Sequence, residues 1–146
     1  MLEISIFKKY KGQTLVEIIL AVAVAITVIV ALVTLAVSAM RFAQSSMMRS
    51  VGEKLAAGGI EAVRIKRNSS VDAYDNLGAG HYFIDGGDLV STSSEFSSIS
   101  YDKYTFSRKI DIGTDTGSYK NIFVEVRWQE GAGDRKVYLS SRIYKY

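Results

Sequence analysis

The sequence contains no cysteine and no proline, and it has a single histidine. Without cysteine, the chain has no disulfide framework, no thiolate metal site and no cysteine nucleophile. The lone histidine, His81, lies in a short predicted strand beside aromatic residues, and no nucleophile–base pair or cluster of metal ligands accompanies it. We therefore expect that the chain is not an enzyme, and we predict no catalytic residue, no metal and no cofactor.

A strong excess of one charge is also missing. The net charge is +3 at neutral pH. Residues 1–12 hold three lysines and Glu3, so the side chains after them sum to only about +1. A protein that binds nucleic acid through phosphate contacts normally carries a clear basic patch. We therefore do not expect nucleic acid among the partners.

The longest stretch without charge spans residues 18–40, whose only polar side chains are Thr27, Thr34 and Ser38. A transmembrane helix needs about 20 predominantly apolar residues, so this stretch is long enough to cross a lipid bilayer. Glu17 lies at its head. An ionisable group at the start of such a segment is costly in lipid and indicates a function that involves a partner.

A specific motif surrounds that carboxylate. Lys8, Lys9 and Lys11 precede the sequence Gly12-Gln13-Thr14-Leu15-Val16-Glu17, which continues directly into the apolar stretch. This arrangement resembles the leader-peptidase site of type IV prepilins and of the pseudopilins of type II secretion. The resemblance covers roughly the first 40 residues. It implies that prepilin peptidase cuts between Gly12 and Gln13, that Gln13 is then N-methylated, and that Glu17 becomes the fifth mature residue, the family's glutamate position.

The resemblance also implies partners and a location. The Glu17 carboxylate would face the terminal amine of a neighbouring pilin or pseudopilin subunit, because opposite charges attract strongly in a low-dielectric layer and each alone is penalised. The chain would cross the inner (cytoplasmic) membrane once with its C-terminus outside, engage the inner-membrane assembly platform, and enter a pilus or pseudopilus after assembly. The lipid bilayer is therefore a further expected partner.

Two departures from the family pattern narrow the assignment. Gln13 stands where the family usually has phenylalanine, and the proline that usually kinks the apolar helix of major pilins is missing. The cleavage assignment survives the first departure, because glycine and glutamate carry more of the motif. The absent proline, the absent cysteine and the small domain together favour a minor pilin or a pseudopilin over a major pilin. The alternative is a single-pass, signal-anchored extracytoplasmic binding protein that does not assemble, in which the lysines of the leader are ordinary positive-inside residues.

The pattern after residue 40 predicts that the helix continues. Apolar and small residues recur every three or four positions up to about residue 67, in a stripe formed by Met48, Val51, Leu55, Gly58, Ala62 and Ile65. We expect Gly58-Gly59 to mark a kink or a close contact with a sheet. The predicted organisation is a cytoplasmic leader (1–12), a transmembrane half-helix (13–40), an amphipathic half-helix (41–68) and an extracytoplasmic β domain (69–146).

The β domain shows strand patterns of period two. Apolar residues alternate with polar ones at Tyr104, Phe106, Ile110 and Ile112, with Arg108 as a break, then at Ile122, Val124, Val126 and Trp128, and finally at Val137, Leu139 and Ile143. A short strand is predicted at residues 81–84, and the serine-rich residues 91–100 are predicted to be a loop. The fold class is therefore α+β, with a long N-terminal helix packed on a small antiparallel meander of three to four strands, as in pilins.

Two pairs of aspartates beside glycines are candidate calcium ligands: Asp85 with Asp88, and Asp111 with Asp115. Asp-Gly sequences are, however, first of all a signature of turns. A calcium site needs six or more oxygen ligands, which these pairs do not supply by themselves. We therefore predict turns at both places and no metal.

Overall fold

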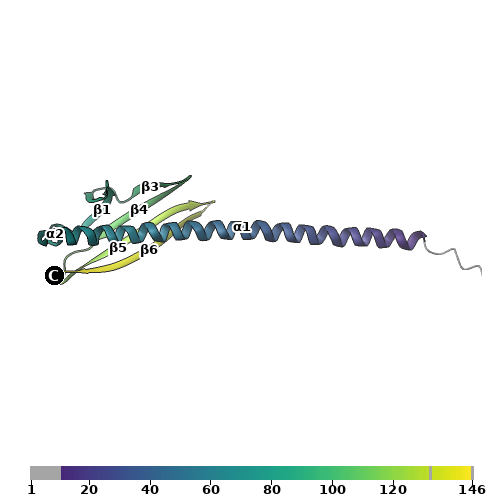
Figure 1. Cartoon of the computed structure of the whole chain (residues 1–146), viewed down its shortest axis with the longest axis horizontal. Coiled ribbons are helices and arrows are strands. Elements are labelled where there is room, and N and C mark those ends of the chain that lie inside the picture. The colour runs from purple at the N-terminus through teal and green to yellow at the C-terminus, as the bar shows by residue number, and fades with distance from the viewer. Residues whose placement is uncertain (1–10, 132, 146) are drawn as a thin grey trace, which may run out of the picture. The chain divides into compact units, whose positions relative to one another are not determined.

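The computed structural model describes residues 11–131 and 133–145. Within these residues, two helices precede six strands (Figure 1). The elements are α1 (Lys11–Ser69), α2 (Val71–Asn76), β1 (Gly80–Asp85), β2 (Asp88–Thr92), β3 (Ser97–Tyr101), β4 (Tyr104–Ile112), β5 (Tyr119–Glu130) and β6 (Gly133–Tyr144). The chain divides into two compact units after Gln44, and α1 contributes residues to both.

The predicted continuation of the N-terminal helix beyond residue 40 is confirmed, because α1 is one helix from Lys11 to Ser69. No proline interrupts its backbone hydrogen bonds. Lys66 and Arg67 lie in its last turn, where positive charge interacts favourably with the helix dipole. The helix ends as predicted, because Ser70 adopts an extended backbone and is the N-cap residue before the short helix α2.

The second unit contains an antiparallel sheet with strand order β2-β1-β4-β5-β6. β3 also pairs with β4, beside the stretch that pairs with β1. The predicted meander is present as β4, β5 and β6, and the predicted short strand is β1. The expected number of three to four strands was too low, because β2 and β3 extend the sheet.

The prediction of a loop at residues 91–100 was wrong over most of its length. β2 extends to Thr92, and β3 begins at Ser97 and pairs with β4 from Ser97 opposite Arg108 to Tyr101 opposite Tyr104. These segments are rich in serine, so the apolar alternation that identified the other strands is weak here. Pairing with β4 supplies the backbone hydrogen bonds of β3 whatever its side chains are.

The break predicted at Arg108 is also absent. β4 continues through Arg108, whose side chain is buried on the same face as Phe106 and Ile110. One guanidinium nitrogen donates to the carbonyl oxygen of Leu55 at 3.4 Å. The period of two was therefore intact, and a charged residue occupies one of its inward positions.

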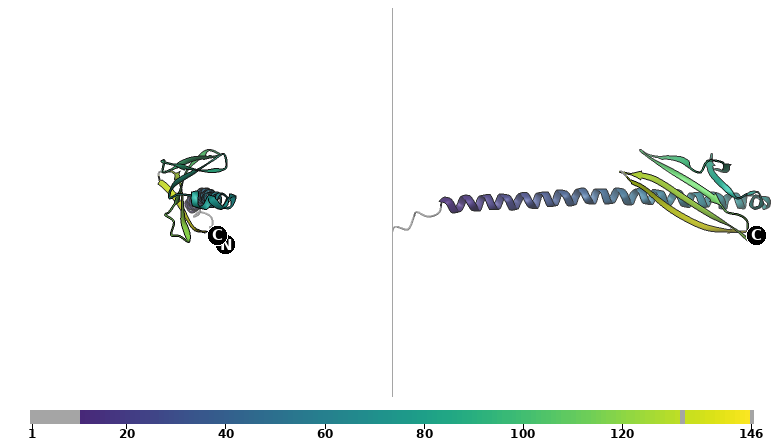
Figure 2. Two further views of the ribbon diagram at one scale, coloured as in Figure 1. Left: turned by 90° about the vertical axis from the view of Figure 1, so that its left-hand side faces the viewer. Right: turned by 180° about the vertical axis from the view of Figure 1, so that it is seen from behind.

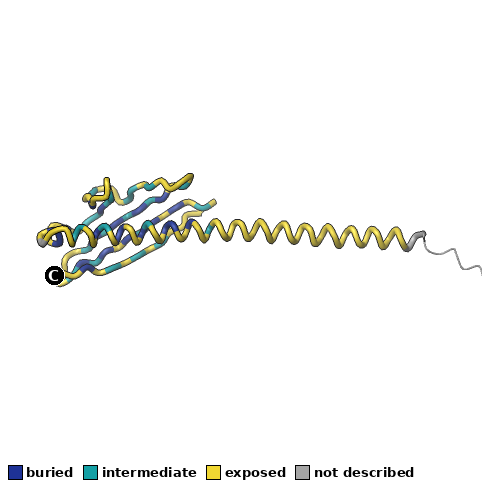
Figure 3. The backbone as a smooth tube through the Cα atoms, in the orientation of Figure 1, coloured by how far each residue is buried: buried dark blue, intermediate teal, exposed yellow. Residues whose placement is uncertain are grey.

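The core of the second unit lies between the sheet and the part of α1 that follows Gln44. Figure 2 shows the strands on one side of this part of the helix, and Figure 3 shows buried residues both on this part of the helix and on the strands. The core residues of α1 are Met48, Val51, Ala56, Ile60 and Val63, and those of the sheet include Phe106, Ile110, Ile122, Val124, Val126 and Trp128. The structure is thus the expected α+β arrangement of a long N-terminal helix on an antiparallel sheet, consistent with a pilin-like fold.

The buried stripe of α1 is shifted by about one residue from the predicted stripe over its second half. Met48 and Val51 are buried as expected, but Gly58 and Ile65 are exposed. The sheet meets Gly59 instead, where an added Cβ would lie 3.0 Å from a methyl of Val124. Of the two roles expected for the glycine pair, close contact with the sheet is the one that the structure shows, and α1 continues without a break at this point.

Candidate functional site

The most unusual surface of the chain is the apolar first part of α1. Every residue from position 14 to position 44 is exposed within the chain. Large side chains are involved, since Leu35 is 71% exposed and Phe42 is 78% exposed. An apolar surface of this extent on a soluble monomer would be a liability, so it indicates contact with lipid or with another protein.

The three hydroxyl groups of the uncharged stretch 18–40 form hydrogen bonds within the helix itself. The hydroxyl of Thr27 donates to the carbonyl oxygen of Ala23 at 2.8 Å, and that of Thr34 donates to Val30 at 2.7 Å. The hydroxyl of Ser38 donates to the carbonyl oxygen of Thr34 at 2.9 Å. In lipid an unsatisfied polar group costs several kcal/mol, about 2–7 by transfer measurements, so these bonds suit the helix to a water-free environment.

Among the described residues, α1 is one helix that is long and apolar enough to span a membrane. The sequence prediction of a membrane-spanning segment is supported to that extent. The candidate residue Glu17 lies on α1 with its side chain exposed, and no ion pair joins it to another described residue. Its carboxylate therefore has no neutralising group within the described chain.

The predicted cleavage site is described only in part. Gly12 and Gln13 lie in the first turn of α1, but their side-chain surroundings are outside the described residues. The leader residues 1–10, which include Lys8 and Lys9, also lie outside the described residues. The leader, the cleavage and the methylation therefore stay predictions.

The four aspartates considered for calcium lie in three places. Asp85 and Asp88 lie opposite each other at the turn between β1 and β2, where Gly86 and Gly87 have φ values of 55° and 97°. Positive φ at both central positions is the requirement of a tight hairpin turn, so the turn prediction is confirmed here. The described residues contain no group of three or more acidic or histidine side chains placed to hold a metal ion.

The other two aspartates have charged neighbours. The carboxylate of Asp111 lies 3.5 Å from Nδ1 of His81 across the β1–β4 pair. Asp115 accepts a hydrogen bond from the backbone N–H of Gly117 at 2.7 Å, and its other oxygen lies 3.6 Å from Nζ of Lys120. Asp115 therefore belongs to the turn before β5 and to the surroundings of a buried lysine.

Sequence reasoning missed that lysine. Lys120 is only 5% exposed, and its Nζ donates to the carbonyl oxygens of Tyr74 at 2.6 Å and Leu77 at 2.8 Å. These bonds tie α2 and the residue after it to the start of β5. Burial, with a smaller contribution from Asp115, raises the pKa of the Tyr74 phenol beside it. The sequence signal that could have identified this lysine is its position two residues before Ile122, because alternate residues of a strand share a face and Lys120 therefore lies on the inward face of β5.

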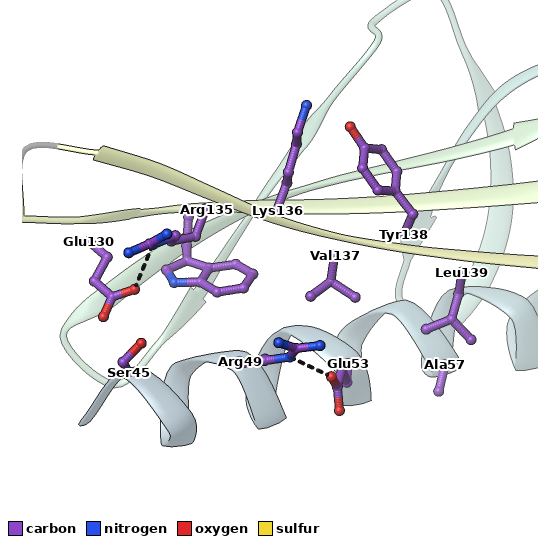
Figure 4. Close-up of a pocket in the computed structure, with 11 residues that line it drawn as sticks. Ser45, Arg49, Glu53, Ala57, Glu130, Arg135, Lys136, Val137, Tyr138 and Leu139 are labelled. Atoms are coloured by element: carbon purple, nitrogen blue, oxygen red, sulfur yellow. Dashed lines mark hydrogen bonds and ion pairs between the residues drawn. The ribbon is translucent and has the colours of Figure 1, made fainter. Parts of the chain in front are cut away.

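Figure 4 shows an open groove between α1 and the first half of β6. Its volume is about 770 Å³. Ion pairs lie along it, between Arg49 and Glu53 at 3.0 Å on the helix and between Arg135 and Glu130 at 3.3 Å on the sheet. Trp128 also lines the groove, and its buried indole Nε1 has no hydrogen-bond partner among the described residues.

Comparison with known proteins identifies no relative, since no protein-family model, no curated protein and no solved structure matches the chain.

Proposed function

We propose that this chain is a prepilin-like structural subunit. In this proposal prepilin peptidase cuts it between Gly12 and Gln13, methylates Gln13, and releases a subunit that assembles into a type IV pilus or a pseudopilus as a minor component. The observation that carries the proposal is the combination of a leader motif with an apolar helix that is exposed from position 14 to position 44. The chain is then the substrate of an enzyme and has no catalytic role of its own.

The exposed apolar side chains of the helix require an apolar environment, and the proposed function provides one before assembly and another after it. Before assembly, the bilayer of the inner membrane surrounds the apolar side chains. After assembly, the helices of sister subunits replace the lipid. Ala21, Ala25 and Ala36 lie on this exposed surface, and small residues allow neighbouring helix backbones to approach closely.

Glu17 gives the assembly a preferred register. A carboxylate in lipid is costly as long as it stays alone. Cleavage before Gln13 would create a terminal amine, and the amine of one subunit would neutralise the Glu17 carboxylate of the next. Breaking such a pair by removing one partner leaves a buried charge, which typically costs about 3–5 kcal/mol.

The second unit would remain in water outside the membrane. Lys8, Lys9 and Lys11 precede the apolar stretch, and lysines at that position favour the cytoplasmic side for the leader. The sheet and the C-terminus would then lie on the opposite side. The proposed partners are prepilin peptidase, other pilin or pseudopilin subunits, the inner-membrane assembly platform and the bilayer.

Intact mass tests the processing step. The chain is produced in cells that contain prepilin peptidase and in matched cells that lack it. We expect loss of residues 1–12 and gain of one methyl group only in the first, and no processing of a Gly12→Val variant. A chain that keeps Met1 in the presence of the peptidase would contradict the proposal and favour the anchored binding protein that does not assemble.

Substitution of Glu17 tests the assembly step. Glu17→Leu should still insert into the membrane, because it makes the segment more apolar, but it should fail to enter filaments. Glu17→Gln is the matched variant that keeps the size and removes the charge, and it should fail in the same way. Filaments or pseudopilus complexes that form equally well with either variant would show that the carboxylate does not pair subunits.

A further inference from the structure

The two edges of the sheet carry opposite charge. One edge is β6, which pairs only with β5 among the described strands, and the other is formed by β2 and β3, which pair only with β1 and β4 respectively. β6 contains three cations and one carboxylate, a net charge of +2: Arg135, Lys136, Arg142 and Asp134. On the opposite edge, β2 and β3 themselves contain one charged residue, Asp88, and further charges lie in the segments next to them. Residues 80–103 together contain four carboxylates and one lysine, a net charge of −3: Asp85, Asp88, Glu95, Asp102 and Lys103.

Several of these charges have no counterion within the described residues. On the acidic edge, Asp85, Asp88 and Asp102 are exposed and take part in no ion pair there. On the basic edge, Lys136 and Arg142 are exposed and lie against aromatic rings, of Tyr138 and Tyr119, and neither these cations nor the exposed Asp134 take part in an ion pair among the described residues. The complementary charges are therefore available on the outside of the unit.

We propose that copies of this chain associate head to tail, with the β6 edge of one copy against the β2 and β3 edge of the next. The proposal rests on the proposed function in that it assigns the contact between the sheets of neighbouring subunits. Unpaired strand edges present open backbone N–H and C=O groups, which are a template for pairing with another chain. The opposite charges of the two edges favour the correct pairing and its register.

The charge pattern also disfavours the competing symmetric arrangement. A two-fold dimer would place one edge against the same edge of its partner, so that cations would face cations or carboxylates would face carboxylates. A head-to-tail contact instead brings unlike edges together, and it leaves one edge of each type free at the ends.

Charged edges also occur as protection against aggregation. That role requires only that each edge carries charge, and it gives no reason for the two edges to carry opposite signs. Here the signs differ, and head-to-tail contact is the one arrangement that they do not oppose. The charges on these edges are exposed, so dissolved salt would weaken the contact. The Debye length is about 8 Å at physiological ionic strength, and it becomes shorter as salt is added.

Cysteine crosslinking of the full chain in membranes tests the contact directly, because the natural sequence has no cysteine. Ser98 of β3 and Ser140 of β6 are exposed serines on the two edges. Ser98→Cys and Ser140→Cys are placed in two differently tagged copies that are produced together. We expect crosslinks between the two tags, and few between copies that carry the same substitution. Crosslinks that form mainly between two Ser140→Cys copies would overturn the proposal in favour of a symmetric dimer.

Charge reversal supplies a second test. Lys136→Glu with Arg142→Glu should lower the yield of the crosslink about tenfold or more, and Asp85→Lys with Asp88→Lys should do the same. All four substitutions in one chain should restore the yield, because the edges are complementary again. Lys54→Glu with Lys66→Glu on α1 is the matched control with the same change in net charge away from both edges. Equal yields in all variants would contradict the proposal.

Helix contacts separate this inference from the proposed function. Ala25→Cys places a thiol on the apolar part of α1, where sister helices would meet in a filament. Crosslinks through Ala25→Cys without crosslinks between the edges would overturn the head-to-tail contact and leave the proposed function standing. Crosslinks between the edges without any through Ala25→Cys would support the contact and contradict assembly through the helix.

Discussion

Nζ of Lys120 donates a hydrogen bond of 2.6 Å to the carbonyl oxygen of Tyr74 and lies 4.3 Å from the centre of the Tyr74 ring. A single cation thus serves both the backbone and the aromatic face of one residue, which lies 46 positions earlier in the sequence. The same nitrogen also donates to the carbonyl oxygen of Leu77. These contacts hold the connection between α1 and the sheet in place.

Removal of the Lys120 ammonium should therefore destabilise the second unit strongly. In Lys120→Met the two carbonyl oxygens lose their donor while they stay largely enclosed, and each buried unsatisfied group costs about 1–3 kcal/mol. We expect the free energy of unfolding to fall by about 2–4 kcal/mol in urea titrations of the full chain in detergent. Lys145→Met, which removes an exposed ion pair with Asp75, should have little effect. Equal losses in the two variants would contradict the assigned role.

Lys120 and Arg108 also show how far the sequence could predict the fold. The period of two located β4, β5 and β6 because their inward residues are almost all apolar. At the two inward positions with a cation, the pattern alone could not separate a break from a buried charge. The difference depends on acceptors from distant parts of the chain, namely the carbonyl oxygens of Leu55, Tyr74 and Leu77.

The sequence predictions of the buried helix stripe and of strand β3 failed for other reasons. A spacing of three or four fits two adjacent stripes on a helix equally well, so the sequence located the buried face of α1 only to within one residue. β3 has the sequence Ser-Ser-Ile-Ser-Tyr, and most of its residues carry no apolar signal. The candidate site residues Gly12, Gln13 and Glu17 came from a local motif, and the edge charges could be grouped only once the strand order was known.

The neighbouring glycines of α1 provide a matched pair of substitutions. Gly59→Ala would place a Cβ 3.0 Å and 3.2 Å from the two methyls of Val124, whereas a Cβ at Gly58 meets no atom within 4 Å. Overpacking of a core typically costs about 1–3 kcal/mol, so Gly59→Ala should lower the free energy of unfolding by that amount. Gly58→Ala should raise it by about 0.5–1 kcal/mol, since alanine is the better helix former.

Chemical denaturation of both glycine variants checks these values. The opposite signs are the decisive feature, because both substitutions add the same methyl group to the same helix. Two stabilised variants would mean that Val124 and Ile110 adjust without cost. Two destabilised variants would mean that a methyl group at position 58 collides with other atoms, contrary to the open space beside Gly58.

Alkaline pH should weaken the folded state through buried tyrosines. Burial raises the pKa of Tyr82, whose hydroxyl donates to the carbonyl oxygen of Gly78 at 2.8 Å, and burial likewise raises the pKa of Tyr74. A phenol in the unfolded chain has a pKa of about 10. Because the folded values lie above it, the stabilising contribution is fully present below about pH 10 and is lost as the pH rises through the folded pKa.

Ultraviolet absorbance during an alkaline titration measures this effect. The folded chain should retain protonated tyrosine at a pH where the chain in urea is already ionised, and Tyr82→Phe should remove part of that late-titrating absorbance. The free energy of unfolding should fall as the pH rises above about 10 in the parent chain, and it should fall less in Tyr82→Phe. Coincident titration curves for the folded and unfolded chains would contradict the prediction.

We expect Arg108 to stabilise the folded state less than an apolar side chain of similar length would. Its guanidinium is buried, its Nε has no hydrogen-bond partner among the described residues, and burial lowers its pKa. No carboxylate forms an ion pair with it in the described part of the chain. Replacement of a buried charge by a well-packed apolar residue is often neutral or stabilising by about 1–4 kcal/mol, so Arg108→Met should unfold at the same or a higher urea concentration.

Arg108→Ala separates the effect of charge from that of volume, because it also removes the charge but leaves a cavity beside Phe106 and Ile110. Its free energy of unfolding should fall by about 2–4 kcal/mol. A large loss in Arg108→Met would instead show that the bond to the Leu55 carbonyl outweighs the desolvation of the cation.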